Sequence, residues 1–460
     1  MAIGLVVILA FGANLEQRTA LRRRPMTDLG VFACAAWAVQ NGEDLYTISD
    51  WHGWHYHYPP TFAILFWPFA HPLPAGRPVP TAGVARTEAN TPWGYDIDSH
   101  RRFYGLHREN FRFFCIVAAW YLISIGLFCL SAHALACALE GRSLTDSLPS
   151  EAGPRGRWWA LRTLPLLICA GSVGTELSRG QVDVVMLAAI ALALYLAARG
   201  TKLKAGICLS IPAALKLFPP LILLYPVWRR SWRMAAGALT GLVLALAVIP
   251  AAALGPERTI ELYRHWTEVL ARPALGQGTD TSRAIELTNM NGTDNQSLLA
   301  FLHNWRYHNV PRRQRPAQAS MAARKWVYGA GALMLLGIGV ASGLRKQDSP
   351  NELVILVGLL TGLAFVVNPI VHNYYYLLLL PLVAALINGR LGDSTRGRGI
   401  WKFPLVLVVF MVVDLLARVP TFGAYLRDLG LPLLSLLFVL WAGAMALREV
   451  TASAACRPIR

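Results

Sequence analysis

Apolar runs close to the length that crosses a bilayer recur along this chain of 460 residues. The runs Val182 to Ala198 and Leu353 to Val367 are apolar on every helical face. A helix needs about 20 apolar residues to cross a hydrocarbon layer about 30 Å thick. A water-soluble domain would instead alternate polar and apolar residues with a helical or strand period. The chain is therefore predicted to be an all-α polytopic membrane protein with about 11–13 transmembrane helices, some of them short and broken.

The net charge of +17 raises the question of nucleic-acid binding. The basic residues, however, fall in short clusters between apolar runs, where they orient a membrane protein and contact lipid headgroups. The 7 cysteines include no Cys-x-x-Cys spacing, so neither a disulfide framework nor a zinc site is indicated. Membrane lipids are predicted partners, and nucleic acid is not.

The basic connections also predict the topology of the second half of the chain. Positive charge favours the cytoplasmic side for four short loops: Arg199 to Lys204, Arg229 to Arg233, Arg345-Lys346 and Arg396 to Arg398. Both ends of the apolar run 203–227 then face the cytoplasm, so that run must be a broken hairpin. The break is expected at Lys216 to Pro220, because proline cannot continue a helix. Residues 255–325 and the turn 368–373 are placed outside.

The N-terminal part has its own pattern. Met1 to Leu15 is apolar without a basic start or clear cleavage site, so a first transmembrane helix is preferred to a signal peptide. Residues 16–58 are predicted to form a first outer loop, with a short interfacial helix from Leu29 to Gln40 that Asn41-Gly42 ends. A long polar loop, residues 74–111, follows, and the whole chain, 1–460, is predicted to be one integral membrane domain.

Ionisable groups at membrane depth are costly, so each is a functional hypothesis. Asp28 precedes the predicted interfacial helix, where the helix dipole favours a carboxylate; simple helix capping is the alternative. Lys216 lies in the broken hairpin with no carboxylate nearby in sequence and would suit an anionic ligand such as a phosphate. A lysine that extends to the membrane interface is its alternative interpretation.

Three further places carry polar residues beside apolar helices. Gln181 and Asp183 open the run 181–199, and Asn291 to Ser297 is a polar stretch that a turn and a helix cap would also explain. His372 lies in the turn 368–373, where it could orient or protonate a substrate or cap a helix. Asp414 and Arg418, one helical turn apart, are predicted to form a structural ion pair.

The sequence lacks a Walker loop, a Gly-x-Gly-x-x-Gly motif and HExxH, so nucleotide-driven and zinc-protease chemistry have no support. A carboxylate, a histidine and a membrane-level cation are instead expected on the outer face. A carboxylate base, with a cation for a lipid-borne phosphate leaving group, suits glycosyl transfer from a lipid-phosphate sugar.

Six motifs, taken in order, carry a resemblance to a known family. They are Asp28 with Gly42 to Tyr46, Tyr58-Pro59-Pro60, Gly180 to Asp183, Ala205-Gly206 with Ala214 to Pro219, Asn295 to Leu298, and Asn368-Pro369 with His372. Together, over about residues 26–390, they resemble the C superfamily of glycosyltransferases (GT-C fold), most closely family 87. That family includes polyprenol-phosphate-mannose-dependent mannosyltransferases. Two positions depart from its pattern: Asp183 replaces an expected asparagine, and Asn368 an expected serine.

The resemblance implies an inverting hexosyltransferase that moves a sugar, most simply mannose, from a polyprenyl-phosphate donor to a lipid or glycan acceptor. It implies Asp28 as general base and His372 as the second catalytic residue. The residues it implies for donor or acceptor binding are Tyr58, Gln181, Lys216, Asn295, Gln296 and Asn373. The lipid-linked sugar is a substrate, so no cofactor is implied, and no sequence motif supports a divalent metal.

Two other classes of protein compete with this interpretation. A secondary transporter or lipid flippase also has broken helices and buried cations, but no inverted repeat is visible in the sequence. A membrane scaffold would leave the outer-face Asp28 without a role. The predicted location is a bacterial inner (plasma) membrane, with the active site facing outward.

Overall fold

The computed structural model describes residues 2–21, 27–49, 54–71, 79–80, 108–216, 220–272, 290–343, 349–392, 402–419 and 421–455. These residues are almost entirely helical. Several predicted features lie outside them: most of the loop 74–111, residues 217–219 of the predicted break, Arg345-Lys346, and Arg396 to Arg398.

The elements of the first half are α1 (Ala2–Thr19), α2 (Asp28–Gln40), β1 (Ile48–Ser49), α3 (Pro60–Leu65), η1 (Trp67–Phe69), β2 (Val79–Pro80), α4 (Arg108–Glu140), α5 (Ala152–Ile168), α6 (Ala170–Arg179), α7 (Asp183–Ala198), α8 (Lys202–Lys216), η3 (Pro220–Leu223) and α9 (Leu224–Trp228). Those of the second half are α10 (Trp232–Val243), η4 (Leu244–Val248), α11 (Ile249–Leu254), α12 (Pro256–Trp266), η5 (Thr267–Ala271), α15 (Leu298–Arg306), η6 (Arg312–Gln314), α16 (Met321–Ser342), α17 (Pro350–Val367), η7 (Asn373–Leu379), α18 (Leu380–Gly392), α19 (Lys402–Leu416), α20 (Phe422–Asp428) and α21 (Leu431–Ala455). The strands β1 and β2 pair antiparallel, with Ile48 opposite Pro80.

The helices confirm the prediction of an all-α polytopic membrane protein. Among the described residues, 6 helices are long and apolar enough to cross a membrane. They are Phe111–Glu140, Trp232–Leu254, Met321–Ser342, Pro350–Val367, Asn373–Leu391 and Leu431–Thr451. Other predicted runs are divided: the chain changes helix at Cys169 within the run 160–175, and α8 ends at Lys216 within the run 203–227. The count of about 11–13 spans stays a prediction.

The broken hairpin is confirmed by the packing of α8 against α10. A Cβ atom on Gly237 would collide with the Leu203 carbonyl, and one on Gly241 would collide with the Ser210 hydroxyl. Small residues at these positions let the two backbones approach closely, as they do between membrane helices. Residues later in α8 contact residues later in α10, so the two helices run parallel to each other. The chain must therefore return between the end of α8 at Lys216 and the start of α10 at Trp232.

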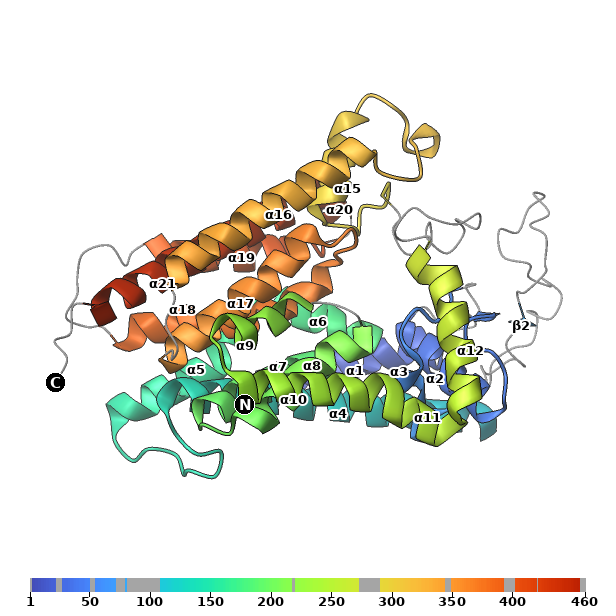
Figure 1. The fold of residues 1–460 in the computed structure, drawn as a ribbon, viewed down its shortest axis with the longest axis horizontal. Coiled ribbons are helices and arrows are strands. Elements are labelled where there is room, and N and C mark those ends of the chain that lie inside the picture. Colours follow the sequence, from blue (N-terminus) through green and yellow to red (C-terminus); the bar gives the residue numbers. More distant parts are fainter. Residues whose placement is uncertain are drawn as a thin grey trace.

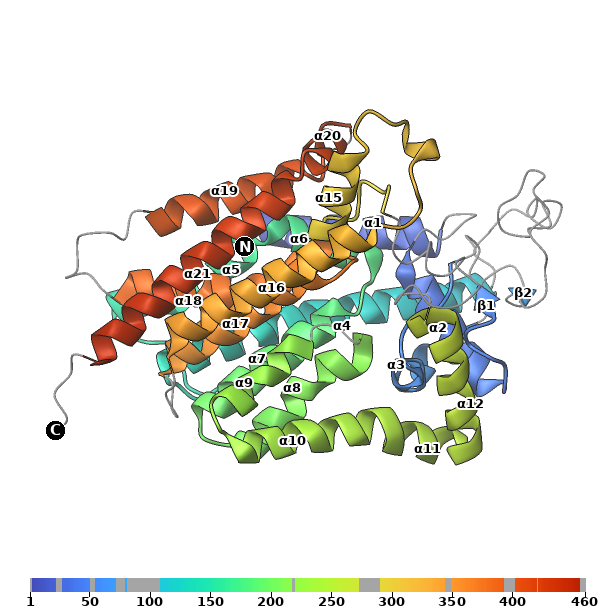
Figure 2. The same ribbon diagram turned by 45° about the horizontal axis from the view of Figure 1, so that its top comes forward.

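The two ends of the bundle hold different elements (Figure 1). At one end, the Arg229 guanidinium donates to the Gly343 carbonyl at 2.7 Å, which joins the end of α9 to the end of α16. The basic starts of α8 and α10 lie at this end too. The opposite end holds α2, α3, α12, α15 and α20 (Figures 1 and 2). This arrangement matches the predicted grouping of basic connections on one side and long loops on the other.

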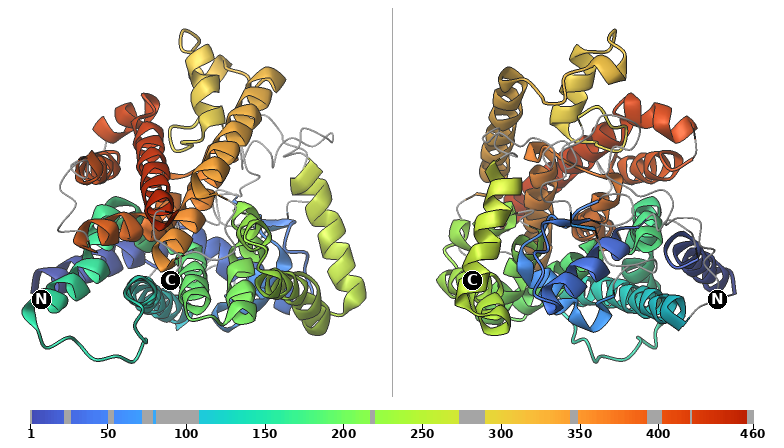
Figure 3. Two further views of the ribbon diagram at one scale, coloured as in Figure 1. Left: turned by 60° about the vertical axis from the view of Figure 1, so that its left-hand side comes forward. Right: turned by 90° about the vertical axis from the view of Figure 1, so that its right-hand side faces the viewer.

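The buried centre of the bundle is formed by α17 and by the helical segment η7–α18. In each of these two segments, 83% of an apolar stretch of 18 residues is buried inside the protein. The corresponding share is 22% for α16 and for Trp232–Leu254. Leu333, Leu336 and Val340 of α16 are exposed, as contact with lipid tails requires. End-on views show these helices as an outer layer around the centre (Figure 3).

Candidate functional site

The site begins where the first outer loop enters α2. Helix α2 starts at Asp28 and ends at Gln40, and Gly42 follows with φ +73°, so the predicted helix and its end are confirmed. Its placement at the membrane interface stays a prediction, but Leu29, Ala33 and the residues around them are buried on every face within the protein. The physical reason is that the helix lacks the polar face that a surface helix needs. The protein holds α2 in its interior and half-buries Asp28 at its N-terminus.

Gly180 brings the next motif to Asp28. This residue ends α6 with φ +64°, a backbone conformation that favours glycine. A Cβ atom on Gly180 would lie 3.0 Å from the Cβ atom of Leu29, the residue after Asp28. The Trp120 indole donates to the Gly180 carbonyl at 3.0 Å and holds the turn. The turn thereby sets Arg179 and Gln181 beside the start of α2.

Lys216 does have a carboxylate partner, which sequence separation concealed. Its ammonium donates to both Asp183 carboxylate oxygens, at 2.9 and 3.0 Å, and Asp183 is 0% exposed. Asp183 is the first residue of α7, and Lys216 the last of α8. The Lys216 side chain is therefore not an unpaired cation. It also does not extend toward the membrane interface, because it is only 5% exposed. The pair is a buried ion pair that closes the ends of two adjacent helices.

Aromatic rings surround this ion pair. The Lys216 ammonium lies 4.2 Å from the ring centroid of Tyr375, and 5.4 Å from those of Tyr58 and Tyr374. The Gln181 amide donates to the Tyr374 hydroxyl at 3.2 Å. Three of the predicted binding residues, which lie far apart in sequence, therefore meet at one cluster of tyrosines.

The predicted polar run 291–297 and the turn 368–373 bind each other. The Asn295 side chain accepts from the Val371 N–H at 3.2 Å and donates to the Pro369 carbonyl at 3.0 Å. The Gln296 N–H donates to the Val371 carbonyl at 2.6 Å, and Asn295 and His372 form an isolated antiparallel bridge. Asn295 thus positions the turn that carries His372. Ser297 also caps α15, as the alternative interpretation of the run predicted.

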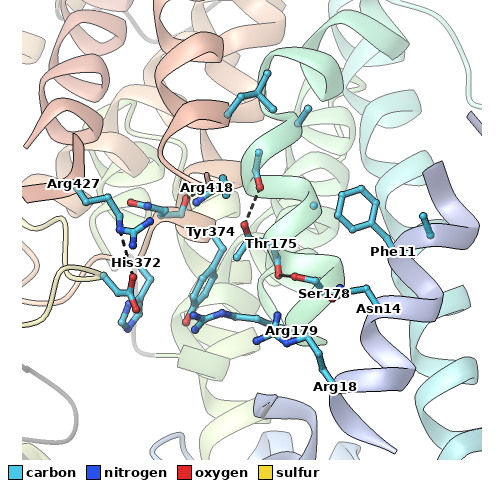
Figure 4. Close-up of a pocket in the computed structure, with 17 residues that line it drawn as sticks. Phe11, Asn14, Arg18, Thr175, Ser178, Arg179, His372, Tyr374, Arg418 and Arg427 are labelled. Atoms are coloured by element: carbon cyan, nitrogen blue, oxygen red, sulfur yellow. Dashed lines mark hydrogen bonds and ion pairs between the residues drawn. The ribbon is translucent and has the colours of Figure 1, made fainter. Parts of the chain in front are cut away.

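A cavity of about 770 Å³ opens beside these elements (Figure 4). His372, Asn373 and Tyr374 contribute to its wall from the turn and η7. Four arginines and one carboxylate also line it: Arg18, Arg179, Arg418, Arg427 and Asp294. The wall carries an excess of positive charge, which suits an anionic ligand.

These arginines differ in how they are held. Arg418 pairs with Asp414 at 2.6 Å, and Asp414 also accepts from the Ser172 hydroxyl at 2.8 Å, which confirms the predicted ion pair. Arg427 lies 3.5 Å from Asp294. Arg179 has neither a hydrogen-bond nor an ion-pair partner among the described residues. Its guanidinium lies 5.5 Å from the Tyr374 ring centroid and interacts electrostatically with Asp28.

His372 is neutral in this setting. Burial, and to a smaller extent Arg179 and Lys216, lower the pKa of its imidazole to about 4. A hydrogen bond with the backbone of Asp294 uses one ring nitrogen, and Nδ1 is buried without a partner among the described residues. The proton is therefore assigned to Nε2, which leaves the buried Nδ1 lone pair as an acceptor without a donor among the described residues.

The sequence matches a known family over well over half its length. Residues 56–369 match the sequence model of glycosyltransferase family 87. The chain belongs to glycosyltransferase family 87. It is also 23% identical over 369 residues to the polyprenol-phosphate-mannose-dependent alpha-(1-2)-phosphatidylinositol mannoside mannosyltransferase of Mycobacterium tuberculosis, a match that covers 78% of this chain and 69% of that protein. No solved structure gives a significant match.

Membership of this family makes the chain a glycosyltransferase, which confirms the predicted enzyme class. The competing predictions of a transporter, flippase or scaffold find no support. No group of three or more His, Cys, Asp or Glu side chains is placed to hold a metal ion within the described part of the glycosyltransferase.

The structure brings several of the predicted site residues together and adds arginines that the sequence analysis did not name. Tyr58, Gln181 and Lys216 converge, and His372 and Asn373 line the cavity. Gln296 lines a second cavity instead. Arg179 directly precedes the Gly180 motif, and this position in the sequence could have indicated that Arg179 lies at the cavity wall.

Proposed function

We propose that this glycosyltransferase moves a sugar, most simply mannose, from a polyprenyl-phosphate donor to a lipid-linked acceptor in one inverting displacement. The observation that carries the proposal is the arginine-lined cavity of about 770 Å³, with Asp28 close enough to Arg179 for electrostatic interaction and His372 in the wall. The similarity to a mannosyltransferase named for a polyprenol-phosphate-mannose donor supports the choice of donor.

Asp28 acts as the general base. Its carboxylate takes the proton of the acceptor hydroxyl while that oxygen bonds to the anomeric carbon of the donor. The bond from the anomeric carbon to the phosphate oxygen breaks, and its electron pair leaves on polyprenyl phosphate. One displacement at carbon gives a product of inverted anomeric configuration. The helix dipole at the N-terminus of α2 favours the charged form of this base.

Arg179 stabilises the leaving phosphate. An unpaired guanidinium at a cavity wall offers several donors in a planar array that matches phosphate oxygens. Lys216 is less suited than predicted, because Asp183 already neutralises it. We assign to the Lys216–Asp183 pair the role of holding Tyr58, Tyr374 and Tyr375 in place around the donor site.

His372 positions substrate hydroxyl groups. A neutral imidazole with Nε2 protonated accepts a hydrogen bond at Nδ1, and a sugar hydroxyl supplies the donor. Asn373 has a buried side-chain oxygen without a partner among the described residues, and it supplies a second acceptor in the same wall. Gln181 orients Tyr374 and shapes the site from the other side.

The site lies at the end of the bundle that holds the long loops, opposite the end with the basic connections (Figures 1 and 2). By the positive-inside rule that end faces outward from a bacterial inner membrane. The donor lipid and the acceptor lipid would then reach the cavity from the outer leaflet. The whole chain acts as one domain in this proposal.

The test is transfer of radiolabelled mannose from polyprenyl-phosphate mannose to a membrane lipid extract. Product from the parent enzyme is expected, and Asp28→Asn should lower kcat by about 10²–10⁴-fold, the usual contribution of a general base. The matched control is Asp146→Asn, an exposed carboxylate of a connecting loop, which should retain parental activity. Equal rates for the parent and folded Asp28→Asn would remove Asp28 from the mechanism. NMR of the product checks that its anomeric configuration is opposite to that of the donor.

A further inference from the structure

Helix α12 is attached to the first outer loop by side chains on one of its faces. It lies beside α3 at the loop-rich end of the bundle (Figures 1 and 2). The Arg258 guanidinium donates to the Gly42 carbonyl at 3.2 Å, and two helical turns later the His265 imidazole contacts the Asp44 carboxylate at 2.5 Å. His265 belongs to none of the six motifs that carry the family resemblance, whereas Asp44 lies within one of them.

The Asp44 carboxylate uses its two oxygens for different tasks. Oδ1 accepts from the Tyr46 N–H at 2.9 Å and so fixes the turn that follows Asp44. Oδ2 contacts Nδ1 of His265. A carboxylate accepts hydrogen bonds and does not donate them, so the ring proton is assigned to Nδ1 of His265. Because Asp44 makes both bonds, His265 holds the turn against α12.

Tyr46 carries this restraint into the interior. Its side chain is 0% exposed, and its ring meets the His265 imidazole edge to face, with the centroids 5.9 Å apart. The Tyr46 hydroxyl donates to the Tyr58 carbonyl at 2.9 Å. A buried phenol that shifted would break this hydrogen bond and leave a polar group unpaired. His265 therefore acts on the backbone of Tyr58 through Asp44 and Tyr46.

Tyr58 lies between the ion pair and the helix that carries the proposed base. Its ring centroid is 5.4 Å from the Lys216 ammonium and 5.8 Å from the ring centroid of Phe32. Phe32 is one turn after Asp28 in α2, and Tyr58 also interacts electrostatically with Asp28. A shift of about 1 Å in a group that positions a substrate can lower a rate by as much as about 10²-fold. The placement of Tyr58 therefore matters to the reaction.

We infer that His265 is a positioning residue of the transfer reaction: it holds Asp44 from α12 and, through Tyr46, fixes Tyr58 beside the donor. This inference rests on the proposed function, because it is in that reaction that Tyr58 serves the donor. His265 contacts no reacting group, and its role lies in the hydrogen bond from Nδ1.

Three variants and one matched control test the inference. His265→Ala removes the first link and Tyr46→Phe the last, whereas His265→Asn keeps an amide N–H donor close to the position of Nδ1. The control, Arg258→Gln, removes another hydrogen bond between the same helix and the same loop, outside the route to the donor site. The Trp266 indole, which donates to the His57 carbonyl at 3.3 Å, is kept in every variant, so α12 stays attached.

Kinetics with polyprenyl-phosphate mannose measure the effect on the donor. His265→Ala and Tyr46→Phe should each raise the donor KM about tenfold, the equivalent of ~1.4 kcal/mol, and leave the acceptor KM unchanged. Their double variant should be no worse than either single variant, because both lie on one route. His265→Asn should recover most of the loss, and Arg258→Gln should behave as the parent. A parental donor KM in His265→Ala, or an equal rise in Arg258→Gln, would overturn the inference.

Fluorine NMR separates this inference from the proposed reaction. The full-length protein is labelled with fluorotyrosine and studied in nanodiscs without substrates, and Tyr58→Phe assigns the Tyr58 signal. His265→Ala should shift that signal, whereas His265→Asn and Arg258→Gln should leave it at the parental position. This pattern supports the positioning role even if no mannose transfer is seen. An unchanged Tyr58 signal in His265→Ala counts against the role even if transfer occurs.

Discussion

Two cationic centres lie close together at the loop-rich end of the bundle, and the protein treats them differently. At the first, Asp183 holds the Lys216 ammonium at 2.9 Å, and the lysine side chain is 5% exposed. At the second, Arg179 faces a cavity of about 770 Å³ without an ion-pair partner among the described residues. A buried charge that the protein itself neutralises serves the fold, whereas one directed into a cavity is available to a ligand.

The comparison gives a physical consequence to one departure from the family pattern, the aspartate at position 183 where asparagine is expected. Asparagine at position 183 would bring no counter-charge to Lys216. Aspartate brings one and removes Lys216 from the set of available cations. Under the proposed function, the arginines of the cavity then take the phosphate of the donor, and Arg179 interacts electrostatically with Asp28.

Removing the Lys216 charge should affect folding most. Lys216→Met leaves Asp183 as an uncompensated buried carboxylate, which typically costs 3–5 kcal/mol of the free energy of unfolding, so on the order of 4 kcal/mol is expected here. Adding Asp183→Asn should recover most of that loss, because no buried charge then remains. Thermal unfolding of the purified protein in detergent, with parent, single and double variants side by side, measures both steps.

One result would contradict the structural role of Lys216. If Lys216→Met unfolded at the parental temperature yet lost affinity for polyprenyl phosphate, the lysine would be a ligand-binding cation after all. The ion pair with Asp183 would then be a resting arrangement that the donor replaces.

Changing Arg179 should affect the reaction and leave the fold intact. Arg179→Gln should lower kcat/KM by about 10–100-fold, the value of one or two charge-assisted hydrogen bonds to the leaving phosphate. The unfolding temperature should stay within about a degree of the parent, because no described ion pair is lost. Arg179→Lys keeps the charge and should recover part of the rate.

Competition with polyprenyl phosphate, the leaving group, gives an independent check on Arg179. Its inhibition constant should rise in Arg179→Gln in step with the loss of kcat/KM. A variant that loses activity while polyprenyl phosphate inhibits as before would show that Arg179 does not contact the phosphate.

Sequence patterns predicted what depends on local chemistry. The apolar runs and basic loops indicated the helical class and the grouping of the ends, and α8 ends at Lys216, where the predicted break begins. The pairing of Lys216 with Asp183 joins residues that are 33 positions apart, and no periodicity reports such a contact. The burial of α2 was missed for a similar reason, since the helices that cover it are distant in sequence. The arginines of the cavity were missed because they resemble the many arginines of the loops.

The pH dependence of stability offers a finer test of the cavity wall. His372 has a folded pKa of about 4, lowered mainly by burial, against an ordinary value of 6.5. The folded state therefore binds fewer protons than the unfolded state between these values, and stability falls as pH decreases from about 6.5 toward 4. The contribution is roughly 1.4 kcal/mol per pH unit in that window, with none above it.

His372→Gln should remove this part of the pH dependence and leave the remainder. Buried His303 also has a lowered pKa and contributes with the same sign, so the quantity to measure is the difference between parent and variant. Between pH 7.5 and 5.5, the parent should lose roughly 1.4 kcal/mol more of its unfolding free energy than His372→Gln does. His308→Gln, at an exposed histidine, is the control and should follow the parent. If parent and His372→Gln lost stability equally over this range, His372 would be able to take up a proton in the folded protein. An imidazole that can do so would be free to donate a proton to the substrate, and its assignment as a neutral acceptor beside Arg179 would have to be abandoned.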